Sequence, residues 1–330
     1  MARALPLSPV TNTSPVTAVT APRALIGWRR HHKRAISGDP VRRRREREAH
    51  AVGISPSESG GASVPPRLDT SSAHSARVWN YLLGGKDNFA ADREVGDMIL
   101  QMFPGIAHIA RLQRRFLGRA VRYLAGEAGI RQFLDIGTGL PTANNTHQVA
   151  QAIAPESRIV YVDNDPMVMV HARALLNSTE EGRTAYLEAD LCDPDMILSR
   201  PELYDTIDLK RPVALMLVAV LHFIPGDGVA GPIVRRLVDA LAPGSYLVAT
   251  HMTVDFAPPQ MVEPYRQMQA AGKLDVWSRS PSEFASLFDG LDLVPPGIVA
   301  CSDWRAEDEP GERRPTPAEV GFIAGMGRLP

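Results

Sequence analysis

The stretch Phe133-Leu-Asp-Ile-Gly-Thr-Gly-Leu-Pro-Thr142 decides the fold, because a short apolar run passes directly into a glycine turn. An apolar run of this length fits a buried strand, and glycine lets the backbone approach a ligand where a Cβ would clash. In an open α/β sheet, ligands bind outside the carboxyl ends of the strands, beside such turns. The stretch therefore predicts an α/β sheet with a ligand site at the end of its first strand, where Asp135, Gly137, Thr138 and Gly139 lie.

Short apolar segments and helical segments alternate along the chain after Gly129. Strands are expected at Gln132–Ile136, Arg158–Val162, Thr184–Glu188, Val213–Val220, Ser245–His251, Leu291–Val294 and Val320–Gly325. Helices are expected near Thr146–Ile153, Met167–Leu176, Asp195–Leu198 and Pro232–Leu241. This alternation is typical of βαβ units, which build a parallel sheet covered by helices on both faces.

The chain before residue 129 divides into two parts of different character. Residues 1–66 are rich in Pro, Ser, Thr and Arg without a sustained hydrophobic period, which predicts a disordered basic extension. Residues 67–128 carry helical periodicity at Arg93–Met102 and Ile106–Ala128, and Gly129 is a typical helix-terminating residue. We therefore expect a cap or lid of helices at 67–128, followed by a core at 129–330.

The distribution of charge limits the classes of partner. Residues 1–50 hold eleven Arg or Lys against three acidic residues, so they carry +8, and the remaining residues carry −9 because the whole chain carries −1. A mildly acidic body argues against a large nucleic-acid surface on the folded part and leaves only the basic tail for such a contact.

No apolar run approaches the roughly 18–20 residues of a membrane helix. Two cysteines without metal-ligand spacing indicate a cytoplasmic protein with neither a disulfide scaffold nor a metal site.

Acidic residues also follow the second and third expected strands. Asp163 ends the second strand, with Asn164 directly after it, and a carboxylate there can accept hydrogen bonds from both hydroxyls of a ribose. Asp190 follows the third strand, where its carboxylate can accept from an adenine amino group while Leu191 lies against the ring. Acids at three successive strand ends indicate a ligand that contains adenosine.

The loop after the first strand distinguishes two classes of adenosine cofactor. A nicotinamide-binding loop normally completes Gly-x-Gly-x-x-Gly and seats a diphosphate on a helix N-terminus, whereas Thr142 takes the third glycine position here. Asp135 stands two residues before the first glycine, where it would repel a diphosphate but suit the amino group of a methionine moiety. The pattern favours S-adenosylmethionine and leaves a nicotinamide oxidoreductase as the weaker alternative.

His222 follows the fourth expected strand, where a methyl acceptor would approach the cofactor. An imidazole can act as general base for a hydroxyl or amine near neutral pH. A histidine that only packs in the pocket wall explains the sequence equally well, so a catalytic and a structural role both stay open. His251, at the end of the fifth expected strand, is a weaker candidate for the same role.

The segment from Ser75 to Arg93, with Tyr81-Leu-Leu-Gly-Gly-Lys-Asp-Asn-Phe89 at its centre, is more specific. The chain resembles the actinobacterial S-adenosylmethionine-dependent methyltransferases of the methyltransferase type 19 group, formerly a domain of unknown function. The similarity also includes the segments Ala110-Arg111, Phe116–Ala125, Asp163–Pro166 and Trp304-Arg305, and so covers nearly everything after Leu68. The chain departs from the family pattern at Trp79-Asn80, where Tyr-Asp is usual, and at Leu112-Gln113, where Ala-Asn is usual.

The resemblance implies a Rossmann-like class I methyltransferase with a seven-stranded, mostly parallel sheet, helices on both faces and an N-terminal helical cap. It also implies S-adenosylmethionine as cofactor, but it supplies no established substrate. The polar, glycine-rich signature indicates a lid over the cofactor, with Tyr81 or Phe89 stacking on the ligand and Lys86 or Asp87 making polar contacts. A structural cap without ligand contact is the alternative.

The sequence therefore predicts methylation of a small molecule at oxygen or nitrogen. An activated sulfonium needs positioning more than acid–base machinery, so the lack of an evident catalytic set does not count against this function. Arg77, Arg111 and Arg114 are candidates for binding an acidic acceptor, unless they are salt-bridged within the protein. The main alternative is a regulatory or interaction protein that binds S-adenosylmethionine without turnover, and RNA methylation guided by the basic tail is a weaker one.

Overall fold

The described part of the protein is built around one mixed sheet of eight strands. The computed structural model describes residues 69–175, 178–272, 274, 276–306 and 313–330, so the basic extension expected at 1–66 lies outside the described residues. The strands are β1 (Gln132–Ile136), β2 (Arg158–Asp163), β3 (Arg183–Glu188), β4 (Ala214–Leu217), β5 (Tyr246–Met252), β6 (Asp292–Leu293), β7 (Val299–Ala300) and β8 (Phe322–Arg328). Each of the seven expected strands is present, and the short β7 is an addition that the sequence did not predict.

The sheet has the order β3-β2-β1-β4-β5-β8-β6, and β7 also pairs with β8. Strands β1 to β5 pair in parallel. Strand β8 runs antiparallel to β5, β6 and β7. Because β1 lies between β2 and β4, the chain crosses from one half of the sheet to the other there, which is the switch point where such sheets bind ligands.

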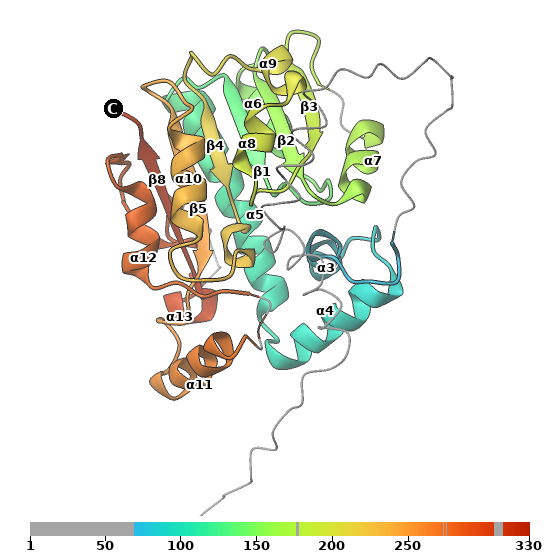
Figure 1. The fold of residues 1–330 in the computed structure, drawn as a ribbon, viewed down its shortest axis with the longest axis vertical. Coiled ribbons are helices and arrows are strands. Elements are labelled where there is room, and N and C mark those ends of the chain that lie inside the picture. The colour runs from blue at the N-terminus through green and yellow to red at the C-terminus, as the bar shows by residue number, and fades with distance from the viewer. Residues whose placement is uncertain (1–68, 176–177, 273, 275, 307–312) are drawn as a thin grey trace, which may run out of the picture.

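Helices cover both faces of the sheet (Figure 1). They are α3 (Ser75–Leu82), α4 (Ala90–Met102), α5 (Ile106–Arg122), α6 (Thr146–Ile153), α7 (Pro166–Leu175), α8 (Pro194–Leu198), α9 (Pro201–Thr206), α10 (Ala230–Val238), α11 (Pro259–Ala270), α12 (Pro281–Ala285) and α13 (Pro317–Val320), with the short turns η1 (Tyr123–Glu127), η2 (Leu221–Phe223) and η3 (Ser286–Phe288). Strand side chains alternate between two hydrophobic clusters. Leu134 and Ile136 pack with residues of α8, α9 and α10, whereas Phe133 packs with residues of α5 and α6. This period of two is what a strand buried on both faces requires.

Two expected boundaries moved for local backbone reasons. The fourth strand ends at Leu217 instead of Val220 because Ala219 has a positive φ of 56° and donates its N–H to Thr250 Oγ1 at 2.8 Å. The last strand begins at Phe322 instead of Val320 because Gly321, at φ 60°, ends helix α13 in the left-handed conformation. An alanine held in that region stores backbone strain, and such residues gather at functional sites.

The N-terminal helices α3 and α4 lie together at one end of the sheet (Figure 1). A buried ion-pair cluster centred on Arg77 joins α3 to both α4 and the core. The Arg77 Nε atom lies 3.5 Å from Asp92 Oδ1 on α4 and 3.3 Å from Asp165 Oδ2 before α7. His74 Nδ1 lies 3.1 Å from the same Asp165 oxygen. Arg77, Asp92 and Asp165 are no more than 4% exposed, so the cluster is shielded from solvent.

None of the helices that the structure describes is long and apolar enough to cross a membrane. The described residues also contain no group of three or more His, Cys, Asp or Glu side chains that could hold a metal ion.

Replacing Arg77 with Met should lower the free energy of unfolding by about 3–5 kcal/mol, because two buried carboxylates would lose their cationic partner. The matched control is Arg236→Met, which removes the exposed ion pair to Asp195 at 2.8 Å and should change stability by about 0–1 kcal/mol. Urea denaturation of both variants measures the difference. Equal losses for the two variants would contradict a stabilising role of the buried cluster.

Candidate functional site

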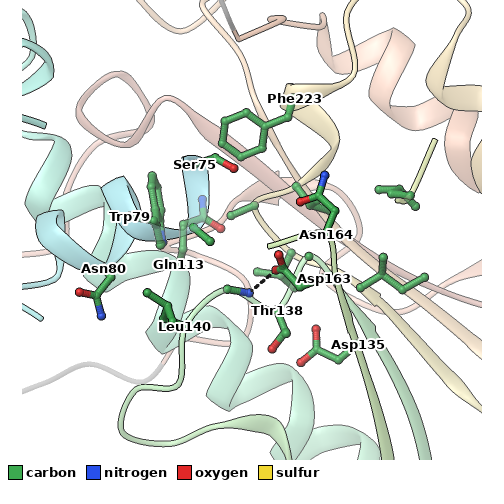
Figure 2. Close-up of a pocket in the computed structure, with 18 of the residues that line it drawn as sticks. Ser75, Trp79, Asn80, Gln113, Asp135, Thr138, Leu140, Asp163, Asn164 and Phe223 are labelled. Carbon is green, nitrogen blue, oxygen red and sulfur yellow. Dashed lines mark hydrogen bonds between the residues drawn. The ribbon is translucent and has the colours of Figure 1, made fainter. Parts of the chain in front are cut away.

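A pocket opens at the carboxyl ends of β1 to β4, and α3 and α5 form its opposite wall (Figure 2). All eight residues predicted at the first three strand ends line it. They are Asp135, Gly137, Thr138, Gly139, Asp163, Asn164, Asp190 and Leu191. The sheet therefore brings together the residues that the sequence spaces over more than fifty positions.

The glycine turn after β1 has the conformation that the sequence predicted. Gly137 and Gly139 have φ values of 74° and 68°, which side chains with a Cβ rarely adopt. A Cβ on Gly137 would clash with the side chain of Val220, so the turn packs directly against the segment after β4. A Cβ on Gly139 would meet no atom within 4 Å and would instead take up open space at the pocket. The Gly139 N–H donates to Asp163 Oδ2 at 2.8 Å and so ties the turn to β2.

Two of the acids are buried and have altered acidity. Burial raises the pKa of Asp135 to about 6, although a hydrogen bond from Thr146 Oγ1 at 2.6 Å and the Arg114 guanidinium act in the opposite direction. Burial also raises the pKa of Asp163 to about 6, against hydrogen bonds from the backbone N–H groups of Asp165 and Gly139. Both carboxyls would gain from further hydrogen-bond donors, which a ligand with amino and hydroxyl groups supplies.

Asp190 and Leu191 extend the pocket beyond β3. The Asp190 Oδ1 atom accepts a hydrogen bond from the Cys192 N–H at 2.9 Å, which shapes the turn after the strand. Leu191 is buried at 7% exposure and adds an apolar surface beside this carboxylate. Asn164, after β2, is exposed at the rim.

The opposite wall comes from helical faces that the sequence reasoning did not assign to the site. Ser75 and Trp79 of α3 and Leu83, which caps this helix, line the pocket and are spaced by four residues, so they share one face. Gln113 and Leu117 on α5 have the same spacing. The spacing of four residues in the segment from Ser75 to Arg93 could have indicated this helix face. The glycines and charged residues of the same segment made the helix hard to recognise.

The sequence profile of the S-adenosyl methyltransferase family matches residues 61–330. The chain belongs to this family. The family and the sheet topology confirm the predicted Rossmann-like class I methyltransferase fold, the methyltransferase activity and S-adenosylmethionine as cofactor.

Two solved structures are similar to the methyltransferase over most of its length. A DUF574 family protein from Streptomyces avermitilis is 47% identical, with 80% of this chain and 100% of that chain covered and a TM-score of 0.73. A putative methyltransferase from Thermobifida fusca is 43% identical, with 82% and 99% covered and a TM-score of 0.71. A comparison with curated proteins gives no match.

The pocket of the methyltransferase fits S-adenosylmethionine by its chemistry. The cofactor carries hydrogen-bond donors on its methionine amino group, its ribose hydroxyls and its adenine amino group. The pocket offers carboxylates at three successive strand ends, Asp135, Asp163 and Asp190, and the first two are buried and have raised pKa values. The open space at Gly139 would admit the ligand close to the backbone.

Tyr81, Lys86 and Phe89 do not lie among the residues that line the pocket. The Tyr81 hydroxyl donates to Asp97 Oδ1 at 2.7 Å, and Lys86 is exposed to solvent. The Phe89 ring lies 5.4 Å from the Arg77 guanidinium carbon. The N-terminal helices therefore line the pocket through other residues of α3 and α5, and cofactor contact by these three residues stays a prediction.

His222 lies in η2, next to the lining residues Phe223 and Ile224, but does not itself line the pocket. Burial, together with smaller effects of His251 and Arg279, lowers its pKa to about 3. Its Nδ1 has no hydrogen-bond partner in the part of the chain that the structure describes. A base of this weakness and position fits the packing role better, so catalysis by His222 stays a prediction that the geometry does not support.

Arg279 holds the η2 segment against the end of the sheet. Its guanidinium donates to the carbonyls of Leu221 at 3.2 Å, Ile224 at 2.9 Å and Gly226 at 3.0 Å. It also donates to His251 Nε2 at 2.8 Å, which leaves the proton of this imidazole on Nδ1, where it is donated to the Met252 carbonyl at 2.7 Å. His251 is thus a support for Arg279, and the pocket wall beside β4 is held by one buried arginine.

Replacing Asp163 with Asn should weaken binding of S-adenosylhomocysteine by about tenfold or more, because the charge-assisted acceptor predicted for the ribose hydroxyls is lost at nearly constant shape. Calorimetric titration measures the affinity. Asp195→Asn, at an exposed carboxylate outside the pocket, should leave affinity unchanged. Unchanged affinity in a folded Asp163→Asn protein would show that Asp163 does not bind the ribose hydroxyls.

The stabilisation of the protein by S-adenosylhomocysteine should grow as pH rises from 5 to 7. Asp135 and Asp163 have folded pKa values raised from 3.8 to about 6, so the stability they contribute to the free protein is full below 3.8 and lost as pH rises through about 6. The ligand's donors favour the ionised carboxylates and offset that loss. Thermal unfolding with and without ligand tests this, and Asp163→Asn should show a smaller pH dependence. A ligand-induced shift in Tm that falls between pH 5 and 7 would contradict it.

Proposed function

We propose that the protein transfers the methyl group of S-adenosylmethionine to an oxygen or nitrogen atom of a small molecule. The observation that carries this proposal is the wall that α3 and α5 build over the strand ends. A pocket closed on that side suits a compact acceptor better than a polymer surface. The net charge of residues 51–330 is −9, because the whole chain carries −1 and residues 1–50 carry +8. This negative charge disfavours a nucleic acid as the methyl acceptor.

We assign the strand-end residues to the parts of the cofactor. Asp163 would accept hydrogen bonds from the ribose hydroxyls, and Asp190 from the adenine amino group, with Leu191 against the ring. Asp135 would accept from the methionine amino group beside the Gly137–Gly139 turn. The order of the acids across the sheet, from β3 through β2 to β1, supports one extended ligand that runs along this edge.

When bound, the cofactor supplies an electrophilic methyl group on a positively charged sulfur. The residues of this chain then have two tasks, which are to hold the acceptor in line with that methyl group and to exclude water. The α3 wall performs the second task, since Ser75, Ala76, Trp79 and Leu83 cover the pocket opposite the strands. Holding the acceptor in place contributes most of the rate in this chemistry.

A regulatory protein that binds the cofactor without turnover is not favoured, because the family consists of methyltransferases. A nicotinamide-dependent oxidoreductase is disfavoured for the same reason. The tail that would guide RNA methylation lies outside the described residues. We propose that the protein is located in the cytoplasm, as its two cysteines predict.

The full-length protein should transfer label from methyl-tritiated S-adenosylmethionine to members of a pooled set of small hydroxyl and amine compounds. At low cofactor concentration, Asp163→Asn should lower the rate about tenfold, in proportion to its loss of cofactor binding. Asp195→Asn serves as the control. Tight binding of S-adenosylhomocysteine without transfer to any small compound would refute the proposed function, as would transfer to RNA alone.

A further inference from the structure

The pocket has a second half that the proposed cofactor contacts do not use. The cofactor acids lie at the ends of β1, β2 and β3, whereas β4 lies on the other side of β1. On that side, lining residues come from α3, from α5 and from the segment after β4, where they are Val218, Ala219, Val220, Phe223 and Ile224. In Figure 2, Ser75, Trp79, Gln113 and Phe223 gather on one side of the pocket and Asp135 and Asp163 on the other. This second half is where an acceptor would meet the cofactor.

Gln113 carries a polar atom without a partner at this place. The residue is 1% exposed, and its Oε1 atom has no hydrogen-bond partner in the part of the chain that the structure describes. Its Nε2 lies 3.5 Å from Cys301 Sγ. Turning the amide by half a revolution would place the nitrogen where the oxygen lies, so either orientation leaves one polar atom unpaired. A buried, unpaired amide atom is costly, and a ligand group that pairs with it recovers that cost.

The surfaces around Gln113 are mainly apolar and aromatic. Trp79 and Phe223 present rings to this half of the pocket, and Leu83, Leu117 and Ile224 add aliphatic surface. Among the described lining residues, Arg114 is the one cation, and its guanidinium donates to the carbonyls of Ala143 at 3.1 Å and Asn144 at 3.0 Å. A charged acceptor would thus lie among apolar groups, whereas a flat, uncharged ring system would bury its faces.

The proton balance also limits the acceptor. A lone pair of the acceptor forms the new bond to the methyl carbon while the carbon–sulfur bond breaks and its electrons return to sulfur, which becomes a neutral thioether. The acceptor then releases its proton to solvent. An amide oxygen orients an O–H or N–H group but is too weak a base to remove the proton, and His222 does not line the pocket. Aromatic hydroxyls, which ionise near pH 10 as tyrosine does, and neutral aromatic amines need the least help.

We propose that the acceptor is an uncharged, planar aromatic compound whose hydroxyl or amino group is hydrogen-bonded by the Gln113 side chain, with its ring against Trp79 and Phe223. This inference rests on the proposed function and adds the substrate class to it. Gln113 binds the acceptor and fixes the direction of its nucleophilic atom.

The test uses the full-length protein saturated with S-adenosylhomocysteine, with 2-naphthol as the planar probe and decahydro-2-naphthol as its saturated counterpart. Calorimetry should show that 2-naphthol binds about tenfold more tightly, since only the planar ring can stack. Gln113→Leu should weaken 2-naphthol binding about five- to tenfold and leave the affinity for S-adenosylhomocysteine within about twofold. Trp79→Leu should also weaken 2-naphthol binding, and Gln101→Leu, on the exposed side of α4, should change neither affinity.

Equal binding of the two probes would overturn the aromatic assignment. A loss of S-adenosylhomocysteine affinity in Gln113→Leu equal to the loss for 2-naphthol would overturn the acceptor assignment, because Gln113 would then belong to the cofactor site. If wild-type protein fails to bind S-adenosylhomocysteine, the proposed function itself fails. If it binds S-adenosylhomocysteine but not 2-naphthol, only the present inference fails.

Discussion

Arg77 is a buried cation between two buried carboxylates, and the shape of the pocket depends on this contact. Its Nε lies within 3.5 Å of Asp92 and of Asp165, which belong to α4 and to the turn before α7. Its Nη atoms donate to the carbonyls of Asp69 and Ser72, both at 2.9 Å. A guanidinium can serve several acceptors at once because its donors point in fixed directions. The cluster therefore sets the position of α3, whose opposite face closes the pocket.

A second buried arginine, Arg279, fixes the wall on the other side of the pocket. Arg279 fixes the η2 segment through three carbonyl oxygens and through His251. The segment begins just after Ala219, whose positive φ turns the chain sharply away from β4. Both walls of the acceptor half are thus held by buried arginines that bond to main-chain oxygens. Such walls keep their position without a ligand, which favours the in-line geometry that methyl transfer needs.

The strand-end acids show how stability and binding are coupled in this fold. Burial makes ionisation of Asp135 and Asp163 unfavourable in the free protein, as their raised pKa values of about 6 show. A ligand that donates hydrogen bonds to these carboxylates removes part of that penalty. The same two groups therefore lower the stability of the free protein and increase its affinity for the ligand. Structures commonly carry such unfavourable groups at functional sites and are stabilised elsewhere.

Local sequence determined the strands, the glycine turn and the acids at three strand ends. These features need only a few adjacent residues, since an apolar run, a positive φ and a following carboxylate are set within one strand and its loop. The parallel sheet then aligns the strand ends, which is why the eight residues predicted at the first three strand ends meet in one pocket. The short β7 was not predicted, and its pairing with β8 is a contact between segments more than twenty residues apart.

Only the tertiary structure decided which side chains of the signature segment and of η2 face the pocket. Trp79 lines the pocket whereas Tyr81 bonds to Asp97, because the rotation of α3 is fixed by Arg77 and its distant carboxylates. Gln113 reaches the pocket through the packing of α5 against the sheet, and Phe223 lines it in place of His222 because Arg279 holds the turn. Contacts between residues far apart in the chain determine which face of each element lines the pocket, and a local period alone does not specify that face.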